Sequence, residues 1–401
     1  MRSVEEHQRI VAGLISPRPA ATVELPDAAR LVLVDDVTAT MSLPVFDNSA
    51  MDGYAVRADE VASATAENPL KLPVAEDIPA GRIDIPPLEP GTVHRIMTGA
   101  PIPAGATAVV PVEATDGGAD IVKINAPSAE GSYIRRAGED VVAGTMVLRA
   151  GQVATPAVVG LAAALGLHEL TVIPRQRVLV ISTGSELVSP GTPLQPGQIY
   201  ESNSIMLAAA VRDAGADVVA TLTASDDVAQ FAALLHRYAA QSDLIITSGG
   251  VSAGAYEVVK DAFGRAGDKG VQFVKVAMQP GMPQGAGRVA GTPIVTVPGN
   301  PVSALVSFEV FIRPALRMAM GLPTPQRPRR SAVLAETLTS PAGKRQFRRG
   351  VFDAAAGTAV SCGPPPSHHL RWLASANCLL DIPADVAEIP AGSQLQIWDL
   401  S

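Results

Sequence analysis

The chain has 401 residues, more than one hydrophobic core usually serves, so we expect several domains. Hydrophobic residues make up 47% and charged residues 17%, as in globular proteins, and a net charge of −8 without long Lys/Arg runs argues against nucleic acid as a partner. The longest apolar run, residues 157–167, is too short to span a bilayer, and the N-terminus carries no apolar signal segment, so we expect no membrane partner.

The first 57 residues predict a helix, a short second element and a polar loop. Ser3 and Glu6 have the spacing of a capping box, which opens a helix that Pro17 ends. A short helix or strand pair follows over residues 28–37. Residues 44–57 then form an unusually dense polar loop between apolar anchors, and its Asp, Asn and Ser residues are equally consistent with simple turn formers.

Short strands broken by Pro and Gly predict a small β domain over residues 64–140. The strands fit residues 70–74, 92–97, 108–112 and 120–124. The adjacent Arg135 and Arg136 suit a phosphate, although a solvated sheet edge is the commoner interpretation. Residues 156–167 predict a capped apolar helix that leads into the next domain.

The next 150 residues alternate apolar strands with capped helices. The predicted strands are residues 177–182, 217–223, 244–246, 271–276 and 293–297. Ser202 or Asn203 caps a helix that ends at Gly215, and Ser225 or Asp226 caps one that runs to about residue 240. This alternation indicates a mostly parallel sheet with helices on both faces.

Three loops follow strands of this sheet and should meet at its carboxyl edge, where ligands bind in such folds. They are residues 183–187, 247–250 and 298–301. Gly249 and Gly250 permit positive φ, so their N–H groups can converge on an anion, although a tight turn is the commoner reason for paired glycines. The acids near these loops are Glu186, Asp226, Asp227 and Glu257. Carboxylates beside an anion site suit Mg²⁺-assisted phosphate chemistry, so the residues predict a Mg²⁺-dependent enzyme or binder for a phosphorylated small molecule.

The remainder predicts one helix and a second β domain. Asn300 caps the helix, Pro301 opens it, Pro314 kinks it and Gly321 ends it. Short strands fill residues 331–401, which include the most basic stretch of the chain. The two cysteines, in the same tail, lack metal-ligand spacing and favour a reducing compartment, so we expect a cytoplasmic protein.

Several motifs together are similar to those of the MoeA and gephyrin E-domain family, the molybdopterin molybdenumtransferases. The dense loop, residues 46–57, reads FDNSAMDGYAVR and is the most specific of them. The others are TGAP at residues 98–101, GED at 138–140, STGSEL at 182–187, SGGVS at 248–252 and PGNP at 298–301. They follow the family order and cover nearly the whole chain.

The resemblance implies an α/β plus β multidomain fold, with a mostly parallel, MogA-like α/β sandwich. It implies an N-terminal helix at 1–20 that packs on the α/β domain, a discontinuous linking domain at 21–43 and 141–170, a β domain at 44–140, a molybdopterin-binding α/β domain at 171–325 and a C-terminal β barrel at 326–401. It also implies a homodimer with the active cleft between subunits.

The implied reaction is the last step of molybdenum cofactor assembly. Adenylated molybdopterin and molybdate are the substrates, AMP is released, and Mg²⁺ is the cofactor. Molybdopterin adenylyltransferase and molybdoenzymes are possible protein partners. Two alternatives stay open: a non-catalytic molybdopterin carrier or scaffold, and a related pterin enzyme that adenylylates molybdopterin or uses another metal oxyanion.

The resemblance also assigns roles to residues. Catalytic roles fall on Asp52, Thr98, Glu186 and Asp226. Metal contacts fall on Glu186, Asp226, Asp227 and Glu257. Ligand contacts fall on Ser248, Gly249, Gly250, Ser252, Lys275, Pro298, Asn300, Pro301, Arg345, Arg349 and Ser367.

Two departures from the family pattern concern charge. Glu257 stands where an aspartate is common, and Gln279 and Met282 stand where many members have lysines, although Lys275 remains. If those lysines attract molybdate, this chain should bind it more weakly or use Arg345, Arg348 and Arg349 instead.

Overall fold

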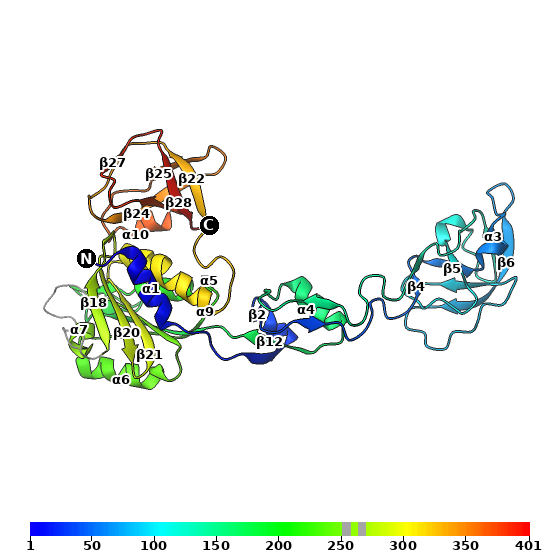
Figure 1. Cartoon of the computed structure of the whole chain (residues 1–401), viewed down its shortest axis with the longest axis horizontal. Helices are drawn as coiled ribbons and strands as arrows, with labels where there is room; N and C mark the ends of the chain where they lie inside the picture. Colours follow the sequence, from blue (N-terminus) through cyan, green and yellow to red (C-terminus); the bar gives the residue numbers. More distant parts are fainter. Residues whose placement is uncertain (251–257, 264–269) are drawn as a thin grey trace. The chain divides into compact units, whose positions relative to one another are not determined.

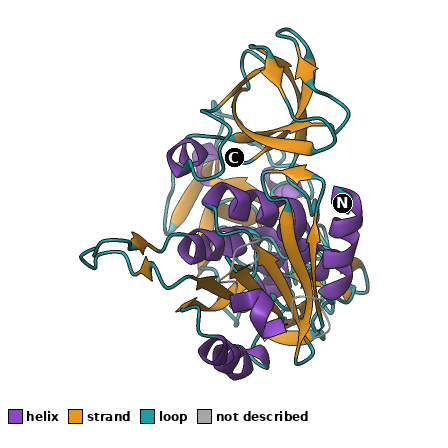
Figure 2. Cartoon of the chain, turned by 90° about the vertical axis from the view of Figure 1, so that its left-hand side faces the viewer, coloured by secondary structure: helices purple, strands orange, loops and turns teal. Residues whose placement is uncertain are grey.

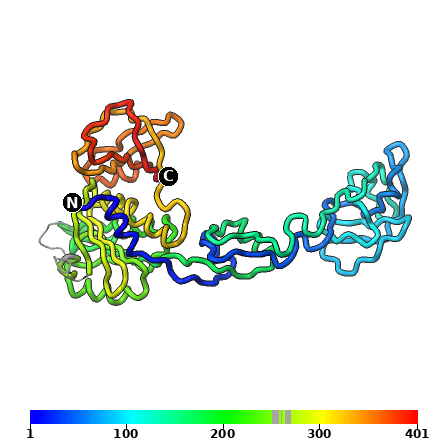
Figure 3. The backbone as a smooth tube through the Cα atoms, in the orientation of Figure 1, coloured from blue at the N-terminus to red at the C-terminus, as the bar shows by residue number. Residues whose placement is uncertain are grey.

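The structure is a computed structural model that describes residues 1–250, 258–263 and 270–401. The chain divides into two compact units, whose elements are drawn in Figure 1 and whose path is traced in Figure 3. The large unit contains Met1–Val23, Arg30–Val34 and Thr171–Ser401, and the inserted unit contains Glu24–Ala29 and Asp35–Leu170. Both chain ends therefore belong to the large unit. None of the described helices combines the length and apolar character that crossing a membrane requires.

The large unit is built around a six-stranded sheet with the order β16-β13-β17-β21-β20-β18. These strands are β13 (Arg177–Thr183), β16 (Asp217–Ala224), β17 (Leu244–Ser248), β18 (Val271–Lys275), β20 (Pro283–Val289) and β21 (Thr292–Val297). The first four in spatial order run parallel, and β20 and β18 add antiparallel strands at one edge. The predicted mostly parallel sheet is confirmed. β20 was not predicted, because its proline and glycines have low β propensity.

Helices cover both faces of the sheet, as Figures 1 and 2 show. One face carries α1 (Val4–Leu14), α5 (Asn203–Asp213), α8 (Pro301–Ser307), η2 (Phe308–Ile312) and α9 (Arg313–Ala319). The other face carries α6 (Val228–Ala239) and α7 (Val258–Phe263). Along β13, Val178 and Val180 belong to the first core, whereas Leu179 and Ile181 belong to the second. The central strands β13, β17 and β21 are mostly apolar because both of their faces are buried.

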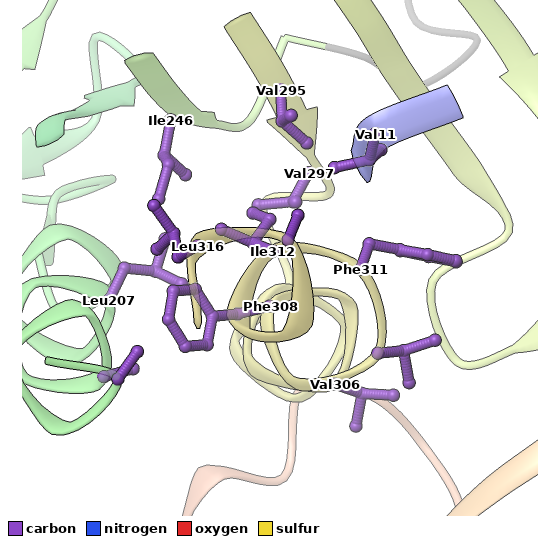
Figure 4. Packing of buried hydrophobic residues seen from close by; sticks show 14 of the residues in the cluster. Val11, Leu207, Ile246, Val295, Val297, Val306, Phe308, Phe311, Ile312 and Leu316 are labelled. Carbon is purple, nitrogen blue, oxygen red and sulfur yellow. The ribbon is translucent and has the colours of Figure 1, made fainter. Parts of the chain in front are cut away.

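The long C-terminal helix of this layer is interrupted. The predicted single helix, kinked at Pro314, is instead α8 followed by the π-helical turn η2 and then α9. The π turn ends directly before α9, whose second residue is Pro314, and this proline cannot donate an intrahelical hydrogen bond. Figure 4 shows how Phe308, Phe311 and Ile312 of the turn pack among the core side chains.

The predicted helix starts are confirmed at α1 and corrected at α6. Ser3 Oγ accepts a hydrogen bond from Glu6 N at 3.0 Å, as a capping box requires. α6 is capped by Asp227, whose Oδ1 accepts from two backbone N–H groups, and not by Ser225 or Asp226 as predicted. Asp226 is thereby left outside the helix and is available for other contacts.

The C-terminal part of the large unit is a closed five-stranded barrel with the order β24-β25-β22-β28-β26, which a β24–β26 pairing closes. Its strands are β22 (Arg329–Leu334), β24 (Arg345–Asp353), β25 (Thr358–Ser361), β26 (Cys378–Ile382) and β28 (Gln394–Asp399). The barrel also carries the pair β23 (Leu338–Thr339) and β27 (Glu388–Ile389), and helix α10 (Leu370–Ala374). The short strand β19 (Met278–Gln279) leaves the α/β region and pairs in parallel with β24. The predicted tail of short strands is confirmed.

The inserted unit contains a five-stranded sheet with the order β8-β5-β7-β6-β9. These strands are β5 (Gly53–Val56), β6 (Leu70–Ile78), β7 (Val93–Ile96), β8 (Ala108–Pro111) and β9 (Ile121–Ile124). Four of the strands match predicted ones. β5 lies within residues 44–57, so the prediction of a polar loop is wrong for the second half of that stretch. Tyr54, Ala55 and Val56 are fully buried, and the density of polar residues before them hid this strand.

Smaller elements complete the two units. They are β1 (Ala21–Glu24), α2 (Leu25–Ala28), β2 (Val32–Leu33), β3 (Val37–Thr38), β4 (Asn48–Ser49), α3 (Ala58–Val61), η1 (Val112–Ala114), β10 (Ile134–Arg135), β11 (Met146–Leu148), α4 (Pro156–Ala164), β12 (Glu169–Ile173), β14 (Leu187–Val188) and β15 (Ile199–Tyr200). The second short element predicted at 28–37 and the helix predicted at 156–167 correspond to parts of this set.

Candidate functional site

A cavity of about 1000 Å³ lies in the large unit, where the carboxyl ends of the parallel strands face the barrel. Its lining residues that carry a polar or charged side chain are Thr183, Glu186, Asp226, Gln279, Asn300, Ser303, Lys344, Ser367 and His368. The backbone of the glycine-rich loops completes the wall on the sheet side. The three predicted loops therefore do meet at one edge of the sheet, as the topology requires.

Two carboxylates reach the cavity from neighbouring loops. Asp226 Oδ2 accepts hydrogen bonds from Ser185 N at 3.1 Å and from Ser185 Oγ at 2.8 Å. Glu186 is exposed, and its carboxylate lies over Gly184, where a Cβ would come within 2.5 Å of Glu186 Oε2. Ser185 thus fixes Asp226, whereas neither carboxylate oxygen of Glu186 accepts a hydrogen bond from a residue that the structure describes.

The paired glycines have the left-handed geometry that was predicted, with φ of +94° at Gly249 and +67° at Gly250. The Gly249 N–H donates to Val297 O at 3.0 Å, so it does not point to a ligand. A Cβ at Gly249 would lie 2.8 Å from both Thr183 O and Thr183 Oγ1. Close approach of neighbouring backbone, together with positive φ, therefore requires glycine here.

Asn203 joins two of the loops and was predicted only as a helix cap. Its Nδ2 donates to Ser248 Oγ at 2.8 Å and to Gly299 O at 2.6 Å. Ser202 occupies the cap position of α5, so the Asn203 side chain is available to bridge the loops after β17 and β21. The sequence signal was ambiguous, because two consecutive polar residues before a helix can both serve as caps.

Glu201 is a second structural residue beside the site whose role the sequence did not reveal. It is buried, its Oε1 accepts from Ser182 Oγ at 2.7 Å and Ser204 N at 2.7 Å, and its Oε2 accepts from Ser204 Oγ at 2.6 Å. These bonds tie the start of α5 to the end of β13, beside the cavity loops. A buried carboxylate with this many donors is a fixed anchor.

The barrel contributes the opposite wall of the cavity. Asn300 Nδ2 donates to Ser367 Oγ at 2.9 Å, which links the loop after β21 to the barrel loop. Arg349 is buried and donates to the carbonyls of Pro364 and His369, so its guanidinium holds the ends of that loop. Burial lowers the pKa of Arg349 from its ordinary value, but the group stays charged at neutral pH.

The predicted site residues after residue 170 divide into three groups. Those that line the cavity are Glu186, Asp226, Gly249, Gly250, Pro298, Asn300 and Ser367. Those of the large unit that do not line it are Asp227, Ser248, Lys275, Pro301, Arg345 and Arg349. Ser252 and Glu257 lie outside the described residues. Asp227 caps α6, Ser248 is buried under Asn203, and Arg345 pairs with Asp381.

Asp52 and Thr98 meet in the inserted unit. Gly53 pairs with Ile96 across β5 and β7, so the residues that flank these strands become neighbours. Asp52 Oδ1 accepts from Thr98 N at 2.6 Å and from Thr98 Oγ1 at 2.7 Å. These bonds lower the pKa of the Asp52 carboxyl from its ordinary value, so the exposed group is ionised at neutral pH.

Glu186 and Asp226 form the donor set that suits Mg²⁺. Among the described residues, no group of three or more His, Cys, Asp or Glu side chains is placed to hold a metal ion. Mg²⁺ does not need one, because it is usually held by one or two carboxylates, waters and the phosphates of a substrate. The two cavity carboxylates therefore fit a Mg²⁺ that arrives with a phosphorylated ligand.

The fold and the cavity define an α/β protein with a carboxylate-bearing, glycine-lined binding site. Residues 2–166 match the MoeA N-terminal region (domain I and II), residues 179–318 a probable molybdopterin binding domain, and residues 331–400 the MoeA C-terminal region (domain IV). The chain therefore belongs to the MoeA family, whose transferases act in molybdenum cofactor biosynthesis.

Individual relatives agree with this assignment. The chain is 74% identical to Molybdopterin molybdenumtransferase 2 of Mycobacterium tuberculosis, in an alignment of 405 residues that covers 100% of both chains. It is 37% identical to Molybdopterin molybdenumtransferase 1 of the same organism, over 99% of this chain and 98% of that protein. The crystal structure of the molybdopterin biosynthesis MoeA protein from Pyrococcus horikosii superimposes with a TM-score of 0.78 at 27% identity, over 100% of this chain and 99% of the other.

Proposed function

We propose that this chain inserts molybdenum from molybdate into adenylated molybdopterin and releases AMP, in a reaction that requires Mg²⁺. The observation that carries the proposal is that Glu186, Asp226 and the glycine-rich loops line the same cavity. Backbone at Gly250 and Gly299 lines this cavity and would receive the phosphates, and the two carboxylates would hold the Mg²⁺.

The residues of the site have separate tasks in this proposal. Glu186 and Asp226 would hold Mg²⁺, which when bound offsets phosphate charge and polarises the phosphorus. Ser185 keeps Asp226 in place, and Asn300 with Ser367 closes the wall against the barrel. Asp52, oriented by Thr98, would position the molybdate or the dithiolene end of the pterin.

AMP release from purified protein tests this proposal directly. The protein is incubated with adenylated molybdopterin and Mg²⁺, with and without molybdate. Molybdate-dependent AMP release that disappears in EDTA and weakens strongly in Glu186→Ala supports the transferase. Tight pterin binding with no AMP release under any of these conditions contradicts it and leaves a carrier or scaffold.

A second candidate, transfer of another oxyanion, rests on one observation. Gln279 and Met282, which stand where the family resemblance implies lysines, line the cavity. Neutral side chains there reduce the attraction for a small dianion such as molybdate. The same AMP assay with tungstate in place of molybdate separates the two candidates. The anion that saturates the rate of AMP release at the lower concentration is the preferred substrate.

The proposal includes a cytoplasmic homodimer that receives its pterin from an adenylyltransferase and passes the product to molybdoenzymes. Cys362 and Cys378 are both buried and unpaired, which agrees with a reducing compartment. Light scattering of the purified chain tests the dimer, since a monomeric mass at assay concentration would contradict it.

A further inference from the structure

One wall of the cavity is a short segment without charge. Residues 279–283, from the end of β19 to the start of β20, all line the cavity. Gln279 carries an amide, Met282 a thioether, and the remaining three residues are two prolines and a glycine. A neutral wall acts on a ligand through its shape and its few polar groups, so its conformation has to be held in place.

This segment is closed at its base and lies against helix α8. The Val276 N–H donates to Met282 O at 2.7 Å, which ties the ends of the turn together. Gly281 has a φ of +96°, and a Cβ there would come within 2.8 Å of Ser307 Oγ, in the last residue of α8. The segment therefore approaches the helix as closely as glycine permits.

The buried side chain of Gln284 joins the segment to this helix. Its Nε2 donates to Gly281 O at 2.6 Å and to Ser307 Oγ at 2.7 Å. Because a carbonyl oxygen can only accept, the amino group of the amide must face Gly281, which fixes the orientation of the side chain. Ser303 lies four residues before Ser307, on the same face of α8, and lines the cavity. One amide thus links two walls of the cavity.

The same amide is poorly suited to a purely structural role. Gln284 Oε1 is buried and has no hydrogen-bond partner among the residues that the structure describes. A buried acceptor without a donor destabilises a fold, and an apolar side chain of the same length would avoid this penalty. The two donated hydrogen bonds, rather than the stability of the core, are therefore what a glutamine adds at this position.

We propose that Gln284 is a positioning residue for the substrate, because it holds residues 279–283 against α8 in the shape that binds the adenylated pterin. Without the amide the segment keeps its bond between Val276 and Met282 but loses both links to α8. Glu186 and Asp226 belong to other loops, so the ligand binds more weakly while the carboxylates stay in place. The inference rests on the proposed function for the identity of the substrate, and on the buried amide alone for the hold on the segment.

Gln284→Met tests this role, because methionine keeps the length of the side chain and cannot donate a hydrogen bond. We expect the KM for adenylated molybdopterin to rise about fivefold, as for the loss of one neutral hydrogen bond, while kcat changes by less than about twofold. Hydrogen exchange of the full chain without ligand, followed by mass spectrometry, should be faster in the peptide that contains Gly281 and Met282.

Gln176→Met is the matched control. Gln176 is also buried in the large unit, its Nε2 donates to Ser16 O at 3.1 Å, and its Oε1 likewise has no partner in the described part of the chain. It is not among the residues that line the cavity. Its replacement should shift the melting temperature about as much as Gln284→Met does, and should leave the KM and the exchange of residues 279–283 unchanged.

Ser307→Ala removes one of the two hydrogen bonds and decides the question if Gln284→Met does not fold. It should raise the same KM about twofold to fivefold and add little on top of Gln284→Met. An unchanged KM and unchanged exchange in the folded variants overturn the inference, as does an equal rise in KM in Gln176→Met. Absence of AMP release by the wild type overturns the proposed reaction instead, and the exchange comparison still decides the role of Gln284.

Discussion

The two sites are built in different ways. In the inserted unit, Asp52 and Thr98 are neighbours because they flank two paired strands. In the large unit, the cavity is lined by side chains from loops that are spread over nearly half of the chain. The first pair depends on one register, Gly53 opposite Ile96. The second site depends on several loops that are linked to one another by Asn203, Glu201 and Asn300. A substitution in the first should act on chemistry alone, and one in the second on both packing and chemistry.

Gly249→Ala should have the largest effect on stability, because Gly249 lies in a loop that packs tightly against a neighbouring loop of the cavity. Left-handed backbone costs a non-glycine residue about 1–2 kcal/mol, and the overlap of the new methyl with Thr183 O adds to it, so we expect a loss of about 3 kcal/mol or more. Both tryptophans, Trp372 and Trp398, belong to the large unit, so urea unfolding followed by their fluorescence reports this unit.

Gly357→Ala is the matched control for this change. Gly357 also has positive φ, at +66°, but a Cβ there would meet nothing within 4 Å. It should therefore lose only the backbone contribution of about 1–2 kcal/mol and keep full AMP release. Equal losses in the two variants would show that the Thr183 contact does not constrain the loop.

Asp52→Asn should give the contrasting result, a loss of activity without a loss of stability. We expect AMP release to fall about a hundredfold, since an ionised carboxylate is replaced by a neutral amide of the same shape. Thr98 can still donate to the amide oxygen, and Asp52 is exposed, so thermal unfolding should be unchanged. Asp59→Asn, at another exposed position of the same unit, is the control; wild-type turnover by Asp52→Asn would refute the assigned role.

The same contrast explains what the sequence could predict. The order of strands and helices around the parallel sheet was readable because the central strands β13, β17 and β21 contain short apolar runs that turn residues follow. β5 and β20 were not readable, because polar residues precede the first and glycines punctuate the second. In β20 the glycines are required by close neighbours: a Cβ at Gly285 would overlap Thr296 Oγ1.

Side-chain partners were the least predictable feature of the site. Motif spacing placed Glu186, Asp226 and the glycines at one sheet edge, and the cavity contains them. It could not show that Arg345 forms ion pairs with Asp381 and Glu5, or that Lys344 lines the cavity. Both features depend on the register of strands in the barrel, and β24 lies more than 60 residues after β19 in the chain. Local sequence carries no information on such long-range pairing.

Acid should weaken the large unit before it neutralises Asp52. Burial and the charge of Arg2 lower the pKa of His7 from 6.5 to about 4, so folding favours its neutral form. The stabilisation is therefore complete above pH 6.5 and is lost as the pH falls from 6.5 to about 4. Between pH 7 and pH 5 we expect the free energy of unfolding to fall by about 2 kcal/mol from this group.

His7→Leu isolates this contribution. Leucine suits the apolar surroundings of His7, which packs edge-on against Phe311 with ring centroids 4.7 Å apart. Urea unfolding at the two pH values should show a smaller acid loss in His7→Leu than in the wild type. His168→Gln, at an exposed position, should retain the wild-type loss. An acid loss that His7→Leu does not reduce would assign the sensitivity to other groups.

Asn203→Ala should have the smallest effect and the most informative one. It removes the hydrogen bonds to Ser248 Oγ and Gly299 O, which should cost about 1 kcal/mol of unfolding free energy. Because Ser248 is the other end of one bond, Ser248→Ala should add little on top of Asn203→Ala, with a coupling of about 0.5 kcal/mol or more in a double-mutant cycle. Strict additivity would mean that the loops are held independently. Coupling accompanied by a raised KM for the pterin substrate would show that the linkage between loops, rather than any single ligand contact, shapes the cavity.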